Sequence, residues 1–150
     1  SNWARSGREC RHNLTYWRNR PYLGFGAGAP GCAHGLRVAN VLRIKTYIER
    51  FEKTSTGLAF PLSPATVNRQ VLTPFVEMQE TMMLGLRLTT EGVSKRIFQQ
   101  RFGQDLLDVF GPEINDLVRL GLLEWNGASI RLTEHGRLLG NQVFMRFVGD

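Results

Sequence analysis

The stretch GLLEWNGASIRLTEHG, residues 121–136, combines a helix stop, two short apolar segments, a tight turn and a helix start. Asn126-Gly127 is a preferred hairpin turn, because both residue types accept positive φ. Residues 122–125 and 129–132 are therefore predicted to pair as antiparallel strands. Thr133 opens a final helix that extends to about residue 148.

Two helices are predicted just before this hairpin. Ser94 caps a short helix that ends at Gly103, and a second covers residues 105–120 with a restart at Pro112. Helix, helix, hairpin, helix is the order of a winged-helix-like module. The apolar residues of this region are expected in the core: Phe98, Phe102, Leu106, Leu107, Phe110, Ile114, Leu117, Leu120 and Leu122.

Upstream, Ser63 caps a long helical pattern that reaches about residue 88 and is kinked at Pro74. Residues 54–64 contain Thr, Ser and Gly followed by two prolines, a composition typical of a linker. We therefore expect a first part over residues 1–55 and a mostly α-helical domain over residues 56–150.

The first part is predicted to contain one strand and one helix. Residues 22–29 (YLGFGAGA) form an apolar run between two prolines, typical of a buried strand, and residues 31–35 follow as a loop. Residues 40–52 place apolar side chains at helical spacing. Residues 1–21 are expected to be irregular, apart from a short turn around residues 14–17. The chain is thus predicted to be α+β.

Composition describes an ordinary globular chain of 150 residues, 42% apolar and 21% charged. No apolar run approaches the roughly 20 residues needed to cross a bilayer. Two cysteines are too few for a disulfide scaffold, so a cytoplasmic location is expected. The sequence begins without Met and in the middle of a pattern, which suggests a fragment of a longer protein.

The net charge of +6 raises the question of nucleic-acid binding. Residues 1–50 carry a balance of +7, concentrated in five arginines: Arg5, Arg8, Arg11, Arg18 and Arg20. The expected recognition helix, residues 105–120, instead carries four acidic residues against Arg119 alone. Phosphate binding by that surface is unfavourable, so DNA binding is the weakest of the functions considered. The arginine-rich segment suits carboxylates or nucleotide-like ligands, or a solvated loop.

Two motifs match known sites only formally. Residues 24–29 (GFGAGA) satisfy the dinucleotide pattern G-x-G-x-x-G/A, but Pro30-Gly31 prevents the helix that this motif requires. A glycine-rich strand end beside a bulky cofactor is the better interpretation. Cys10-x-His12 and Cys32-x-His34 have one intervening residue, fewer than structural zinc sites use.

The densest chemical cluster is His12-Asn13-Leu14-Thr15-Tyr16-Trp17. Imidazole is a common axial ligand of haem iron, and neighbouring aromatic rings can pack on a porphyrin. Nearby arginines can pair with propionates. Simple packing of the aromatic side chains is the alternative.

Several stretches together resemble the oxygen-independent coproporphyrinogen III oxidase-like radical-SAM family. They are SNWARSGRECRHNLTYW, YLGFGAGA and RVAN in residues 1–40, then MMLGLRLTTEGV, FQQRFG and residues 121–144. Within that family, HNxxYW is similar to the mark of the HemW-type haem chaperone branch. The resemblance covers nearly the whole chain. It implies that residues 1–55 are the last strand–helix unit of a radical-SAM partial barrel, followed by the family's winged-helix-like C-terminal domain.

The resemblance also implies a parent protein with S-adenosylmethionine and a [4Fe–4S] cluster held by CxxxCxxC. Those cysteines are absent here, so this chain alone is expected to be inactive in radical chemistry. By the same resemblance His12 is the candidate ligand of haem iron. The other expected cofactor-binding residues are Arg11, Asn13, Tyr16, Trp17, Arg18, Gly26, Gly28 and Ala29, the last near S-adenosylmethionine. This chain departs from the family at Pro30, where relatives usually have His.

The leading functional expectation is the C-terminal part of a haem chaperone that passes haem to an acceptor protein. The alternative is coproporphyrinogen III oxidase, an enzyme that decarboxylates porphyrinogen propionates. Expected partners are haem or porphyrin, the N-terminal barrel of the parent and the acceptor. Without the barrel, apolar faces of residues 22–29 and 40–52 would be exposed, so a homodimer is also expected.

Overall fold

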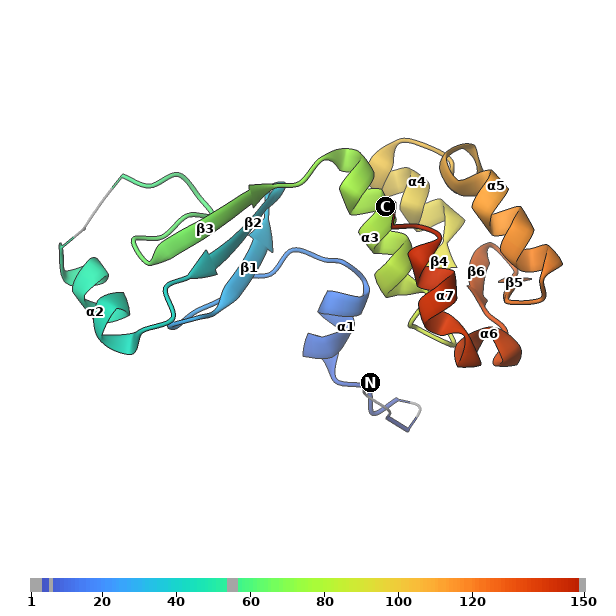
Figure 1. Cartoon of the computed structure of the whole chain (residues 1–150), viewed down its shortest axis with the longest axis horizontal. Coiled ribbons are helices and arrows are strands. Elements are labelled where there is room, and N and C mark those ends of the chain that lie inside the picture. The colour runs from blue at the N-terminus through green and yellow to red at the C-terminus, as the bar shows by residue number, and fades with distance from the viewer. Residues whose placement is uncertain (1–3, 6, 54–56, 149–150) are drawn as a thin grey trace. The chain divides into compact units, whose positions relative to one another are not determined.

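The computed structural model describes residues 4–5, 7–53 and 57–148 (Figure 1). Its mixed helices and small sheets divide into two compact units. Unit 1 combines residues 1–19 with residues 74–150, and unit 2 covers residues 20–73. The expected domain boundary at residues 55/56 remains a prediction. The two compact units divide instead at residues 19/20 and 73/74. Within the described residues, no helix is long and apolar enough to cross a membrane.

Unit 1 is built from helices around a small antiparallel sheet with the strand order β4-β6-β5. Its elements are α1 (Arg11–Trp17), α3 (Pro74–Gly85), β4 (Val93–Ser94), α4 (Lys95–Phe102), α5 (Leu106–Arg119), β5 (Leu123–Asn126), β6 (Ser129–Leu132), α6 (Glu134–Leu138) and α7 (Gly140–Met145). Segment α1 is thus separated in sequence from the rest of its unit by all of unit 2.

The predicted helix boundaries around the hairpin are confirmed. The Ser94 side chain accepts a hydrogen bond from the Ile97 amide, and Gly103 ends α4 in the left-handed conformation. Asp105 caps α5 by accepting from the Leu107 amide at 2.9 Å. The helix is interrupted at Phe110, where φ and ψ leave the helical region, just before Pro112. Proline lacks an N–H and displaces the preceding turn, which explains the predicted restart.

The hairpin itself is confirmed with a shift of its turn. Asn126 pairs with Ser129, so Asn126 belongs to β5 and the two-residue loop is Gly127-Ala128. Gly127 has a φ of 61°, which glycine adopts without steric cost. The single final helix predicted over residues 133–148 is wrong: α6 and α7 are separated at Leu139, which leaves helical geometry.

Unit 1 has a continuous apolar core. Its buried members are Met78, Met82, Leu86, Val93, Phe98, Leu106, Phe110, Ile114, Leu117, Leu122, Leu123, Ile130, Leu132, Val143, Phe144 and Phe147. Of the expected core residues, Phe102 and Leu107 pack against this cluster without being fully buried. Leu120 was expected inside but is 57% exposed, because it is the C-cap of α5 and lies past its buried face.

Unit 2 is a three-stranded antiparallel sheet with the order β1-β2-β3 and one helix. Its elements are β1 (Pro30–Ala33), β2 (Leu36–Asn40), α2 (Ile44–Lys53) and β3 (Thr66–Val71). His34 and Gly35, both with positive φ, form the tight turn between β1 and β2. Two positive φ values match the right-handed twist of the strands they join.

Three predictions for this unit and for the start of the helix that follows it are wrong. Residues 22–29 form no strand beyond an isolated bridge between Tyr22 and Cys32, and the strand lies in the segment expected to be a loop. Residues 66–71 are β3 instead of helix, because pairing with β2 satisfies their backbone. Pro74 begins α3 instead of kinking a longer helix, as proline suits a first helical position. The predicted linker, residues 54–64, lies partly outside the described residues.

Candidate functional site

The HNLTYW motif forms α1, a helix of seven residues. A helix this short is not stable by itself in water, so contacts with the rest of unit 1 must hold it. Its N-cap residue, Cys10, contributes no side-chain hydrogen bond. Its C-terminal end, by contrast, is fixed by several polar contacts from other elements.

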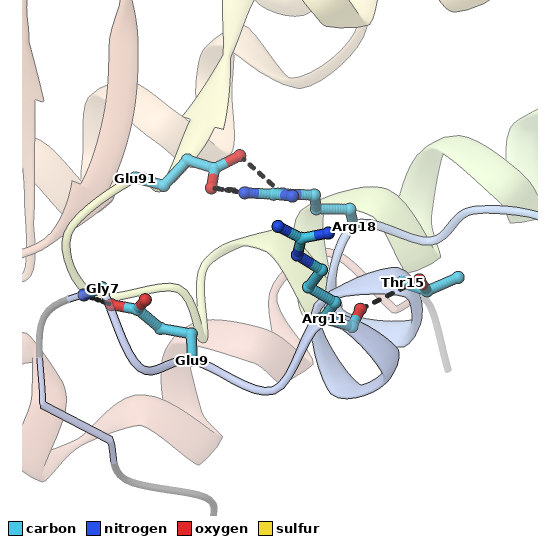
Figure 2. A network of polar contacts seen from close by, with 6 residues as sticks. All are labelled: Gly7, Glu9, Arg11, Thr15, Arg18 and Glu91. Carbon is cyan, nitrogen blue, oxygen red and sulfur yellow. Dashed lines mark hydrogen bonds and ion pairs between the residues drawn. The ribbon is translucent and has the colours of Figure 1, made fainter.

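The strongest of these contacts joins α1 to the segment between α3 and β4. Arg18 donates from Nη2 to a Glu91 carboxylate oxygen at 2.7 Å, and from Nε to both oxygens at 3.1 and 3.2 Å (Figure 2). The hydrogen bonds that Arg18 donates to Glu91 raise the pKa of the Arg18 guanidinium. Arg18 is therefore charged and already engaged by a carboxylate within the protein.

Asn19, directly after Arg18, is anchored from two helices. Its side-chain amide donates to the Glu77 carbonyl and to Thr81 Oγ1 on α3. Arg101 on α4 donates to the Asn19 carbonyl at 2.6 Å. Asn19 also adopts a φ of 47°, a conformation in which Asn is enriched. These contacts position the motif helix firmly on unit 1.

One face of α1 carries His12 and Tyr16. Tyr16 Oη and His12 Nε2 lie 3.0 Å apart, and the two rings meet edge to face with centroids 4.8 Å apart. The spacing of four residues places them on consecutive turns of the helix. His12 is exposed to solvent. This face therefore presents an accessible imidazole beside an aromatic ring.

The other face of α1 lines a groove of about 1200 Å³ within unit 1. Asn13, Leu14, Trp17 and Arg18 contribute from α1. The remaining walls come from residues 87–91, from the segment before α1 and from residues 137–144. His12 and Tyr16 do not line this groove. The motif is thus divided between two surfaces.

The Arg87 side chain lies over two aromatic rings in the groove. Its guanidinium carbon lies 5.7 Å from the centroid of the Trp17 ring and 4.3 Å from that of Phe144. Stacking on aromatic faces is a favourable position for a guanidinium and fixes its orientation. The arginine rests against the tryptophan of the motif.

The glycine-rich segment lies in unit 2 and is held by Asn40. The Asn40 side chain, in a residue only 6% exposed, donates to the carbonyls of Gly24 and Gly26 at 3.3 and 3.0 Å. Its oxygen accepts from Ser63 Oγ. A side chain at Gly24 would place its Cβ 2.0 Å from the Pro30 carbonyl oxygen. The segment is a fixed turn packed closely against β1.

The backbone of the remaining expected residues is also tied down. Gly26 donates its amide to Tyr47 Oη, and Gly28 donates to the Val41 carbonyl. Ala29 accepts from the Asn40 amide. Gly26, Gly28 and Ala29 therefore form one local arrangement in unit 2, separate from the arrangement around α1 in unit 1.

The structure unites some expected site residues and separates others. His12 and Tyr16 share one face, whereas Asn13, Trp17 and Arg18 line the groove. Arg11 is exposed and lies outside the groove lining. Sequence reasoning missed Glu91, Asn40 and Arg87. No local pattern distinguishes them, because their partners are distant in sequence.

The described part of the chain holds no group of three or more His, Cys, Asp or Glu side chains arranged for a metal ion. Cys10 is in unit 1 and Cys32 in unit 2, and neither forms a disulfide. These residues do not fit the three-cysteine set of a [4Fe–4S] cluster, so no cluster ligand is assigned to them.

Comparison with known proteins places this arrangement in a family. Residues 72–139 match the HemN C-terminal domain. The solved structure of Escherichia coli coproporphyrinogen III oxidase (HemN), described as a radical SAM enzyme, is similar with a TM-score of 0.59 and 20% identity. That likeness covers 85% of this chain and 28% of the other. The chain therefore carries a HemN C-terminal domain over residues 72–139 and matches the C-terminal part of HemN and HemW proteins.

Several sequence relatives of the chain are haem chaperones named HemW. The chain is 40% identical to the haem chaperone HemW of Bacillus subtilis and 34% identical to HemW of Lactococcus lactis. Both matches cover 100% of this chain and 37% of the relative. The chain therefore spans little more than a third of the length of these haem chaperones.

Proposed function

We propose that this chain is the C-terminal part of a radical-SAM haem chaperone, which binds haem and transfers it to an acceptor protein. The observation that carries this proposal is the exposed His12–Tyr16 pair on a helix anchored to a HemN-type domain. HemW relatives that match the whole chain support the same function.

His12 is the proposed axial ligand of the haem iron. A ligating imidazole nitrogen needs an available lone pair, and Nε2 lies at hydrogen-bond distance from Tyr16 Oη. If Nε2 ligates iron, it exchanges this contact for the metal. Tyr16 and Trp17 are proposed to pack on the porphyrin. Asn13, in the same motif, is proposed to be a further haem-binding residue. Arg11 and Arg18 were the expected propionate partners, but Arg18 already holds Glu91.

Residues 1–55 are proposed to contain the last strand–helix unit of the parent's radical-SAM barrel, and residues 56–150 its winged-helix-like domain. In the parent, Gly26, Gly28 and Ala29 would lie against S-adenosylmethionine, since a turn without side chains allows close approach. The cluster would be held by residues outside this chain. A cytoplasmic location is part of the proposal, because a reducing compartment suits two cysteines that form no disulfide.

Unit 2 exposes a large amount of apolar surface. Phe25 and Leu42 are 84% and 82% exposed, and Ile44, Ile48 and Phe51 of α2 are exposed as well. We propose that barrel segments of the parent cover this surface, and that the isolated chain covers it by forming a homodimer. Light scattering should show a dimer for the chain, and F25E/I48E should shift it to a monomer. A monomeric wild-type chain would contradict the dimer.

The second candidate is coproporphyrinogen III oxidase, an enzyme, and the fold likeness to HemN favours it. In that case the parent would decarboxylate coproporphyrinogen III, and His12→Ala would reduce turnover without any haem being bound. A nucleic-acid function is weaker still, because α5 carries Asp105, Asp108 and Asp116. It would require strongly salt-dependent duplex binding by unit 1.

The test of the chaperone is a haem titration followed in the Soret region. The chain should give a shifted Soret band that His12→Ala abolishes. Tyr16→Phe should retain the band and bind haem a few-fold more tightly, since a hydrogen bond worth about 0.5–1.5 kcal/mol no longer competes for Nε2. His135→Ala, which removes an exposed histidine of α6, is the matched control. A Soret band unchanged by His12→Ala would overturn the assignment of the ligand.

A further inference from the structure

We propose that Arg87 is the residue that binds a porphyrin carboxylate, in the groove between α1, residues 87–91 and residues 137–144. This proposal rests on the proposed haem function and names a binding residue outside the HNLTYW motif. The HNLTYW motif then has two parts. His12 and Tyr16 present an imidazole on one face of α1, and Trp17 lies near Arg87 on the other face.

The environment of the Arg87 guanidinium carries the argument. It rests on Phe144 at 4.3 Å and lies near Trp17 at 5.7 Å. Stacking uses the face of the planar group and leaves its N–H donors at the edge for a bidentate carboxylate. Within the described residues, Arg87 has no carboxylate partner. It is an oriented cation in a groove where the described carboxylates, Glu9 and Glu91, have other hydrogen-bond partners.

The other charges of the groove leave it available to an anion. Glu91 is held by Arg18 through three contacts, and Glu9 accepts a hydrogen bond from the Gly7 amide. Arg8 and Arg137 line the same groove and add positive charge. Because the acidic groups are already engaged, a carboxylate ligand meets a net positive surface.

The volume and apolar lining of the groove suit a large ligand. The groove volume of about 1200 Å³ exceeds the roughly 300–1,000 Å³ typical of pockets for drug-sized molecules. Leu14, Leu138 and Phe144 supply apolar surface beside the guanidinium. A tetrapyrrole has such a combination, an apolar macrocycle with carboxylates at its edge.

Arg87 fits this role better than the two arginines next to the motif. Arg18 lines the groove but would have to leave Glu91 to bind a ligand. Arg11 is exposed and lies outside the groove lining. Arg87 requires neither a broken ion pair nor a movement of the helix.

The test uses iron-free protoporphyrin IX, which carries the propionates but cannot be ligated by His12. Binding to the 150-residue chain is followed by porphyrin fluorescence. Arg87→Gln should weaken binding about tenfold or more, as expected for a lost charge-assisted pair. Arg87→Lys should be intermediate, since it keeps the charge and loses the planar fork. Arg96→Gln, an exposed arginine of α4 outside the groove, is the control and should bind like wild type.

The outcomes separate this inference from the proposed function. Equal binding by wild type and Arg87→Gln, with unchanged thermal unfolding, would overturn the role of Arg87 and leave the groove to another partner such as a peptide. If His12→Ala abolishes the haem Soret shift in the same experiment, the chaperone proposal still stands. Weaker porphyrin binding by Arg87→Gln, with a Soret shift that survives His12→Ala, would support the groove and reject the axial ligand. No detectable binding of the iron-free porphyrin would overturn the groove.

Discussion

Unit 1 and unit 2 bury their apolar residues very differently. Unit 1 surrounds a continuous cluster in which Phe98, Leu106 and Ile130 are almost completely buried. In unit 2 the buried apolar side chains are few and, apart from Leu72, small, while large ones such as Phe25 and Leu42 are exposed. Burial of apolar surface is the main source of folding free energy. Unit 1 therefore has its own core, whereas unit 2 leaves most of its large apolar side chains exposed.

The largest effect is expected from the core of unit 1. Phe98 is 1% exposed and contacts the rings of Phe102 and Phe110. Phe98→Ala should lower the free energy of unfolding by about 3–5 kcal/mol, because it leaves a cavity. Val71→Ala in unit 2, at a residue that is 74% exposed and outside the proposed dimer surface, is the control and should change it by no more than about 0.5 kcal/mol. Guanidinium denaturation followed by circular dichroism measures both, and equal losses would remove the distinction between the units.

Within unit 2, stability should depend on a polar contact more than on apolar burial. Asn40→Ala removes the donor shared by the Gly24 and Gly26 carbonyls and should cost about 1–3 kcal/mol locally. Amide hydrogen exchange at Gly26 and Gly28 should accelerate accordingly. Asn68→Ala, on the exposed strand β3, should leave those amides unchanged. Slow exchange retained in Asn40→Ala would show that apolar contacts hold the turn instead.

A smaller effect concerns the attachment of α1 to unit 1. Glu91→Gln removes the carboxylate that Arg18 holds, and since both side chains are partly exposed the cost should not exceed about 1 kcal/mol. Amide exchange in α1 should accelerate, while the thermal midpoint of unit 1 stays nearly constant. Glu124→Gln, which breaks the surface pair with Arg131, is the control. If both variants affect α1 alike, the anchoring role of Glu91 is wrong.

The smallest effect at neutral pH is expected from the cap of α5. The hydrogen bond from the Leu107 amide lowers the pKa of Asp105 below its ordinary value of 3.8, with a further contribution from Lys95. A lowered folded pKa means that the cap stabilises above 3.8 and is lost as the pH falls through the folded value. Thermal midpoints measured from neutral to acidic pH should decline less steeply for Asp105→Asn. Asp108→Asn, exposed on the same helix, should follow the wild-type curve, and identical curves for all three would exclude the cap.

Predictions from local signals succeeded mainly in unit 1. The caps Ser94 and Asp105 and the restart at Pro112 depend on residues within one or two turns, so the sequence contains the whole interaction. Residues 66–71 were misassigned because Val67, Val71 and Phe75 happen to continue the helical spacing of α3. Pairing with β2 decides that segment, and β2 lies far away in the sequence.

The candidate site divides in the same way. The contact between His12 and Tyr16 spans one helical turn, so the motif by itself indicates it. The contact between Trp17 and Arg87, by contrast, joins residues from opposite sides of unit 2 in sequence.

The sequence alone determined the hairpin, the helix caps, the aromatic and histidine cluster and the family resemblance, because each is a short pattern with a local physical cause. Only the tertiary structure decided that α1 belongs with the C-terminal helices, that Arg18 is engaged by Glu91 and that Arg87 meets Trp17. These features depend on chain segments brought together by burial of a common core. Such packing selects partners by shape and burial, which no local pattern of residues encodes.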